Sequence, residues 1–192
     1  MVESKRKVAV VTDSATAFTP ELVAVHSLYV ARMEITIDGN TMVDGANTEL
    51  TNFYSMLESS ESIPTSSAPK PSEYVDQFTK ASQTAESIFC VSVAAKLSAA
   101  YAAANSGAYL FKNDHPEIEI RVFNSATAAS SQALITLAAA RVAAAGYSID
   151  QVEGTLTANI WLRQWWQDGN LIWNPDDYNN SYYHHENTEN KI

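Results

Sequence analysis

Cysteine is almost absent from this sequence, since Cys90 is the only one among 192 residues. A single thiol can form no intrachain disulfide and cannot supply a cysteine-based zinc site. Cys90 lies inside the apolar run SIFCVSV, which is typical of a buried strand. We therefore interpret it as a core residue rather than a nucleophile.

Basic residues and cofactor motifs are scarce as well. The chain has 12 Lys and Arg against 22 Asp and Glu, a formal net charge of −10. Binding to nucleic acid or to anionic lipid surfaces needs clustered cations, so this balance argues against both partners. Phosphate-binding glycine signatures and GxSxG are missing, and the His184-His185 pair has no second ligand cluster. We expect neither a cofactor nor a metal site.

Long apolar runs are missing too. The most apolar stretch, ALITLAAARVAAAG, is interrupted by Arg141 and falls short of the ~20 residues that a membrane span needs. The basic start MVESKRKVAV has no apolar segment before a cleavage site, so it does not resemble a secretory signal. These absences predict a soluble cytoplasmic protein without a membrane span.

The sequence does contain a regular alternation of strand-like and helical segments. The strand-like runs cover residues 7–11, 28–37, 87–93 and 118–124, and the longer helical segments cover 52–60, 71–85, 96–113 and 126–146. Alternation at this spacing is typical of βαβ units. It predicts an α/β fold, with a mainly parallel sheet and helices on both faces, over residues 1–155.

Several boundaries of these segments carry specific signals. Thr19-Pro20-Glu21 is typical of a helix start, and Gly146 is placed to end the alanine-rich helix at its C′ position. Ser148 and Gln151 fit a capping box, and Asp38-Gly39 is a hairpin turn dipeptide. Residues 156–192 break the pattern, because they contain all four tryptophans and end in an Asn/Tyr/His-rich segment. We interpret them as an atypical tail, out of frame or disordered.

Small polar side chains follow or flank the strand ends in four places. They are Thr12-Asp13-Ser14, Ser66-Ser67, the segment 92–98 and Asn124-Ser125. Ligands collect at the carboxyl ends of parallel strands, so these groups are expected to meet there. Two interpretations stay open: ordinary helix caps, or an anion site built from hydroxyls and helix-start N–H groups. No histidine is placed beside a candidate nucleophile, which favours binding over catalysis.

The order of the motifs resembles the DegV family of bacterial fatty-acid-binding proteins. The segments that carry the resemblance are VTDSATAFTPEL, YVARMEITIDGNTMVDG, FYSML, PTSSAPKPSEYVDQF, AKLSAAYAAA and RVFNSATAASSQA. They follow one another at the family's spacings from about residue 7 to about residue 155. The resemblance implies non-enzymatic binding of a long-chain fatty acid, and a fatty acid kinase as partner in some members.

The resemblance also implies which residues bind the carboxylate. Carried over by motif, the ligand-binding residues are Thr12, Ser14, Ser66, Ser67, Ser98 and Ser125. Asp13 is expected to organise the loop rather than to catalyse, because its charge would repel a carboxylate. Several family hydroxyls, glycines and a glutamine are replaced here, at Ala68, Ala94, Ala95, Ala99, Ala100, Ala129, Ser131 and Ala133. These replacements are expected to weaken the site.

The family's C-terminal domain has no counterpart in the chain, which therefore resembles a truncated member. A single domain would expose the face that the second domain buries, and homodimerisation is one way to cover it. Two alternatives to fatty-acid binding remain. One is a small hydrolase or transferase acting on a phosphate or acyl group at the same loops, and the other is a structural remnant without a ligand.

Overall fold

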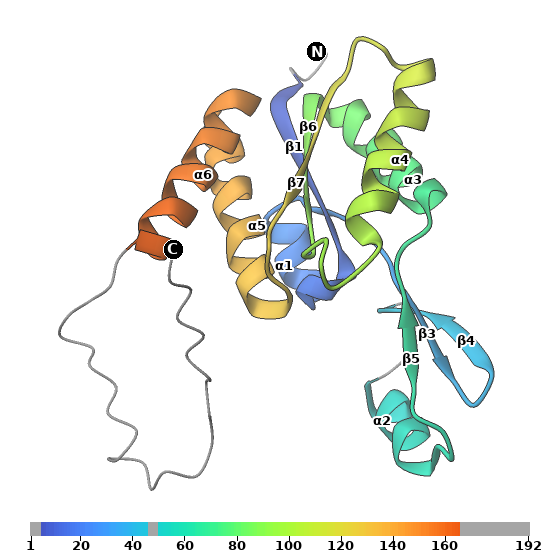
Figure 1. Cartoon of the computed structure of the whole chain (residues 1–192). Helices are drawn as coiled ribbons and strands as arrows, with labels where there is room; N and C mark the ends of the chain where they lie inside the picture. Colours follow the sequence, from blue (N-terminus) through green and yellow to red (C-terminus); the bar gives the residue numbers. More distant parts are fainter. Residues whose placement is uncertain (1–4, 46–49, 166–192) are drawn as a thin grey trace, which may run out of the picture. The chain divides into compact units, whose positions relative to one another are not determined.

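A computed structural model of the chain describes residues 5–45 and 50–165 (Figure 1). Of the tail predicted over 156–192, residues 156–165 belong to the last described helix, and residues 166–192, with His184 and His185, lie outside the described residues. The elements are β1 Arg6–Asp13, a 3-10 turn η1 Ser14–Thr16, α1 Pro20–Val25, β2 Tyr29–Ala31, β3 Glu34–Ile37, β4 Asn40–Val43, α2 Leu50–Ser59, β5 Thr65–Ser67, α3 Pro71–Thr84, β6 Ala85–Ser92, α4 Ala100–Asp114, β7 Glu119–Asn124, α5 Ala129–Ala144 and α6 Ile149–Trp165.

Four parallel strands form the main sheet, in the order β2-β1-β6-β7. The register aligns Val11 of β1 with Tyr29 on one side and Cys90 on the other, and Cys90 with Val122. Both central strands, β1 and β6, are almost entirely buried after their first residues. This arrangement confirms the predicted α/β fold with a parallel sheet.

Helices pack on both faces of this sheet, because successive strand residues point to opposite sides. Val10 and Phe89 join one buried cluster with residues of α5 and α6, whereas Val11 and Cys90 join another with residues of α3 and α4. Cys90 is completely buried, and burial raises the pKa of its thiol well above its ordinary value. The sheet and its two helical layers therefore make the core.

A second, three-stranded antiparallel sheet has the order β4-β3-β5. The single strand predicted over 28–37 is wrong, since β2 joins the parallel sheet and β3 joins this one. Between them, the Met33 N–H donates to Ser14 Oγ at 3.0 Å rather than to a strand. Residues 65–67, predicted as part of a loop, form the short strand β5. The Asp38-Gly39 hairpin turn is confirmed, with φ of 46° and 79°.

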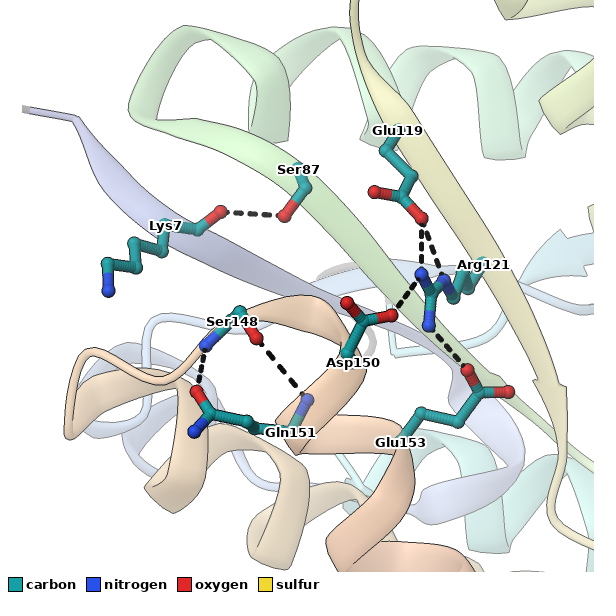
Figure 2. Close-up of polar contacts among 8 residues, drawn as sticks. All are labelled: Lys7, Ser87, Glu119, Arg121, Ser148, Asp150, Gln151 and Glu153. Atoms are coloured by element: carbon teal, nitrogen blue, oxygen red, sulfur yellow. Dashed lines mark hydrogen bonds and ion pairs between the residues drawn. The ribbon is translucent and has the colours of Figure 1, made fainter.

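The predicted boundary signals of α1, α5 and α6 are confirmed, whereas α4 begins at Ala100 and α5 at Ala129, later than the predicted residues 96 and 126. The Thr19 hydroxyl accepts from Leu22 N–H at 3.4 Å, and Gly146 has φ of 82° just beyond α5. Ser148 and Gln151 form both hydrogen bonds of a capping box at the start of α6, 2.9 and 3.4 Å long (Figure 2). Within the described residues, no helix combines the length and apolarity that a membrane crossing requires.

Arg121 ties the edge strand β7 to α6. Its guanidinium donates to Glu119 at 2.6 Å, to Asp150 at 2.5 Å and to Glu153 at 2.7 Å (Figure 2). The carboxylates of Glu153, Asp150 and Glu119 raise the pKa of Arg121. The ion cluster therefore holds the first turns of α6 beside the sheet.

Candidate functional site

Asp13 occupies the end of the central strand β1 and is completely buried. Its Oδ2 accepts from Val93 N–H at 2.9 Å, and its Oδ1 accepts from Gln132 Nε2 at 2.9 Å and from Ala15 N–H at 3.3 Å. Burial raises the pKa of the Asp13 carboxyl, and these hydrogen bonds oppose the rise. One carboxyl group thus connects the end of β6, the first turn of α5 and the turn after β1.

A buried polar cluster surrounds Asp13. Thr12 Oγ1 donates to the Val91 carbonyl at 2.8 Å, and Gln132 Nε2 lies 3.4 Å from the same hydroxyl. Within the described residues, Gln132 Oε1 and the Tyr74 hydroxyl are buried without a hydrogen-bond partner. The Tyr74 hydroxyl faces Asp13, and burial raises its pKa. Two unpaired polar atoms thus lie in the cluster beneath the strand ends.

The loops after β6 and β7 are joined to one another. Ser125 N–H donates to the Ser92 carbonyl at 3.0 Å, and Asn124 Oδ1 accepts from Ala95 N–H at 3.2 Å. Ser98 is half-buried, and its hydroxyl accepts from Ala100 N–H at 3.2 Å at the start of α4. The structure therefore brings the predicted segments 92–98 and Asn124-Ser125 together.

The hydroxyls of these segments differ in their access to a ligand. Thr12 is completely buried and Ser125 is 1% exposed, and both hydroxyls bond internal carbonyl groups. Ser14 and Ser98 are half-buried. Ala126 in the loop after β7 and Ala129 at the first position of α5 have positive φ of 54° and 51°. Alanine adopts this conformation only where its surroundings hold it, which is common at ligand-binding loops.

Ser66 and Ser67 do not precede a helix directly, contrary to the sequence-based expectation. They lie in β5, opposite Ile35 and Glu34 of β3. Neighbouring residues of a strand point to opposite faces, so Ser66 shares a face with Ile35, and Ser67 shares the other face with Glu34. Among the described residues, no hydrogen bond joins either side chain to the loops after β1, β6 or β7. Only one of the two serines can therefore face any one ligand.

A pocket of about 430 Å³ lies along β2, the edge strand of the parallel sheet. Residues of η1, α1, β2 and α3 line it, and Ser14 is the predicted ligand-binding residue among them. Its polar lining also includes Arg32, Gln77 and Lys80. These three residues could not be recognised in the sequence, because they come from separate segments and belong to no motif. Within the part of the chain described, no three His, Cys, Asp or Glu side chains gather to hold a metal ion.

The sequence of this chain is similar to that of known proteins. The family model of uncharacterised proteins of the DegV family matches residues 7–160. A DegV domain-containing protein of Listeria monocytogenes is 26% identical over 147 residues, which cover 76% of this chain and 50% of that protein. The chain thus spans about half the length of the curated relatives that it matches.

Solved structures share the fold. A DegV-family protein from Ruminococcus gnavus, described with vaccenic acid, is 27% identical with a TM-score of 0.72, over 80% of this chain and 54% of that one. The Streptococcus pneumoniae Fatty Acid Kinase B3 protein, loaded with linoleic acid, is 20% identical with a TM-score of 0.68, over 79% and 53% of the two chains. The second likeness concerns the fold alone.

Proposed function

This chain belongs to the DegV family, and we propose that it binds a long-chain fatty acid without catalysing a reaction. One observation carries the proposal: the Ruminococcus gnavus structure, which has the same fold and the higher identity of the two described above, holds vaccenic acid. The bound acyl chain would supply most of the affinity, because each buried CH₂ contributes about 0.8 kcal/mol before ordering costs.

The carboxylate is held by hydroxyls at the carboxyl edge of the parallel sheet. Direct contact falls to the half-buried Ser14 and Ser98 and to one of Ser66 and Ser67. Thr12 and Ser125 support them from below, since their buried hydroxyls already bond carbonyl groups. Hydroxyl and backbone N–H donors suit a carboxylate, because hydrogen bonds to a charged acceptor are the stronger ones.

Asp13 organises these loops. Its carboxyl oxygens accept from three groups on three different elements, which supports a positioning role. Both oxygens are occupied, and a carboxylate ligand would be repelled by a second charge, so Asp13 is not assigned a direct contact. Asp13 is also completely buried, so its carboxyl group is not accessible to a substrate as a general base would have to be.

The alanines that replace family hydroxyls remove donors from the loop after β6. Ala94 and Ala95 in this loop, and Ala100 at the start of α4, are among them, and each leaves the carboxylate with one fewer side-chain hydrogen bond. We expect a fatty acid to bind more weakly here than in a member that retains them. A fatty acid kinase is the proposed partner, on the strength of the family resemblance and the name of the pneumococcal neighbour.

Equilibrium titration of the delipidated protein with palmitate, by displacement of a fluorescent fatty acid, tests the proposal. Saturable displacement is expected. Ser67→Ala or Ser66→Ala, but not both, should weaken binding by roughly tenfold if that hydroxyl meets the carboxylate. Ser106→Ala is the matched control, because Ser106 is exposed on α4. If palmitate displaces none of the fluorescent fatty acid from folded protein, the proposed function is refuted. If both serine variants bind palmitate as tightly as the wild type, β5 is not part of the site.

A further inference from the structure

The antiparallel sheet and helix α2 form a unit that is attached to the rest of the chain at two crossings. The chain enters this unit at Arg32-Met33, between β2 and β3, and leaves it at residues 68–70, between β5 and α3. We call the unit, residues 34–45 and 50–67, the arm, and the remaining described residues the body. Within the described residues β3 pairs with β4 and β5, and with no strand of the parallel sheet. The two sheets are therefore joined by the chain crossings and not by strand pairing.

The arm is held together by contacts of its own. Asp38 Oδ1, at the hairpin turn between β3 and β4, accepts from Ser60 Oγ at 3.1 Å and from the N–H and Oγ of Ser62 at 3.1 and 2.7 Å. The hydroxyls of Thr36 and Thr41 hydrogen-bond across β3 and β4 at 2.9 Å. These bonds tie the hairpin to the segment after α2, so the arm can move as one piece.

The first crossing is anchored by hydrogen bonds at the base of the arm. The Met33 N–H donates to Ser14 Oγ at 3.0 Å, which ties the start of β3 to the turn after β1. The Arg32 N–H donates to Glu73 Oε1 at 3.3 Å, and Arg32 Nη1 donates to the Asp44 carbonyl at 2.8 Å, just beyond β4. These bonds hold the base, so a movement about this crossing would displace the hairpin turn the most.

The second crossing combines a stiff backbone with a weak contact. Pro69 is buried, and Pro71 begins α3. A proline restricts the residue before it to extended backbone, so Ala68 permits a small swing rather than free rotation. Lys70 Nζ donates to Glu34 Oε1 at 2.7 Å across the crossing. Both side chains are partly exposed, and ion pairs of this kind stabilise little and are screened by salt. The crossing therefore acts as a restricted hinge.

The arm has little core of its own. Among its residues whose burial is described, Ile37 alone is buried, at 2% exposed. Val43, Tyr54 and Ile63 are exposed. Segments with few buried apolar side chains open at a low free-energy cost, whereas the parallel sheet of the body is buried on both faces. The arm is therefore expected to move more easily than the body.

We propose that the arm is hinged at its two crossings, and that a ligand bound at the strand ends fixes its position. The second part rests on the proposed function, in which the ligand contacts one of Ser66 and Ser67 on the arm together with Ser14 and Ser98 on the body. A ligand that contacts both parts binds most tightly in the arm position that brings them together, so it shifts the population toward that position. Hinge closure of this kind is a common response to a ligand.

Distances between paired spin labels, measured by pulsed electron paramagnetic resonance, test the hinge. Asn40 is exposed on β4 of the arm, and Lys112 and Arg141 are exposed on α4 and α5 of the body. The native Cys90 is completely buried, so introduced cysteines take the labels. Asn40→Cys with Lys112→Cys reports the arm against the body. Arg141→Cys with Lys112→Cys is the matched control pair within the body.

Without ligand, the distance distribution of the arm–body pair should be broader than that of the control pair. Palmitate should narrow it to the width of the control pair and leave the control pair unchanged. If the arm–body distribution is already as narrow as the control without ligand, the hinge is overturned.

The role of the ligand is tested separately from the hinge. If the displacement titration shows that palmitate binds, but the broad distribution stays unchanged, the link between ligand and hinge is overturned and the proposed function stands. If wild-type protein binds no palmitate, the proposed function fails and the link with it, and the ligand-free distribution still decides whether the arm is hinged.

Discussion

Gly107 of α4 packs closely against the first turn of α3. A Cβ at this position would lie 2.8 Å from the Pro71 carbonyl oxygen and 2.8 Å from Tyr74 Cβ. Real Cβ atoms essentially never approach other atoms below 3.0 Å, and the obstacle here includes backbone. The first turn of α3 would therefore have to move. Since Tyr74 faces Asp13, this movement would reach the cluster beneath the strand ends.

Two opposing effects set the result of Gly107→Ala. Overpacking a tight contact costs typically 1–3 kcal/mol, whereas replacing glycine by alanine inside a helix gains roughly 0.5–1 kcal/mol. We expect a net loss of about 1–2 kcal/mol in the free energy of unfolding. Gly154 in α6 is the matched control, because a Cβ there has nothing within 4 Å. Gly154→Ala should gain only the higher helix propensity of alanine, without overpacking, and so raise the free energy of unfolding by about 0.5–1 kcal/mol.

Urea unfolding, followed by circular dichroism, measures both variants. The urea concentration at the midpoint of unfolding should fall for Gly107→Ala and rise for Gly154→Ala. The slope of the free energy of unfolding against urea concentration should be unchanged in both variants. If Gly107→Ala stabilises the protein as much as Gly154→Ala, the close packing of α3 on α4 is wrong, and with it the position assigned to Tyr74.

Two further predictions concern charged groups. Arg121→Met should lower the free energy of unfolding by about 1–2 kcal/mol at low ionic strength and by less at high salt, since each of its exposed ion pairs contributes at most about 1 kcal/mol. Arg141→Met is the control, because Arg141 is exposed on α5. If urea unfolding shows the same loss for both variants, the stabilising role of the Arg121 ion cluster is contradicted. Because burial raises the pKa of Asp13 above its ordinary value of 3.8, the native state holds that proton more tightly than the unfolded state. The stability of the wild type relative to Asp13→Asn should thus fall as pH rises from 3.8 through the raised native pKa, and a rise would refute the assigned direction.

The main sheet could be predicted because its signals are local. Apolar runs end at turn and cap residues, and the capping pair Ser148 and Gln151 is readable within four positions. The split of residues 28–37 could not be predicted. Its alternation is continuous through Arg32 and Met33, and alternation does not reveal which neighbouring strand each half will pair with. The strand Thr65–Ser67 gave no signal either, because all three residues are polar and exposed.

The candidate site, like the fold, could be predicted from the sequence only in part. The strand-end position of Asp13 and Ser14 followed from their place after a buried run, and the fold puts the ends of β1, β6 and β7 together. Arg32 and Lys80 are 48 positions apart in the sequence and belong to no shared pattern. Only the packing of α1 and α3 beside β2 places them on one pocket. Within the described ranges 5–45 and 50–165 neither side chain forms an ion pair, which is equally a property of the folded chain.

The most direct test of fatty-acid binding uses protein purified from bacteria without added lipid. The folded protein is denatured and extracted, and the extract is examined by mass spectrometry against the protein concentration. We predict a long-chain fatty acid in the extract of the wild-type protein. Well-folded wild-type protein that carries no fatty acid, and takes up none when palmitate is supplied, would contradict it.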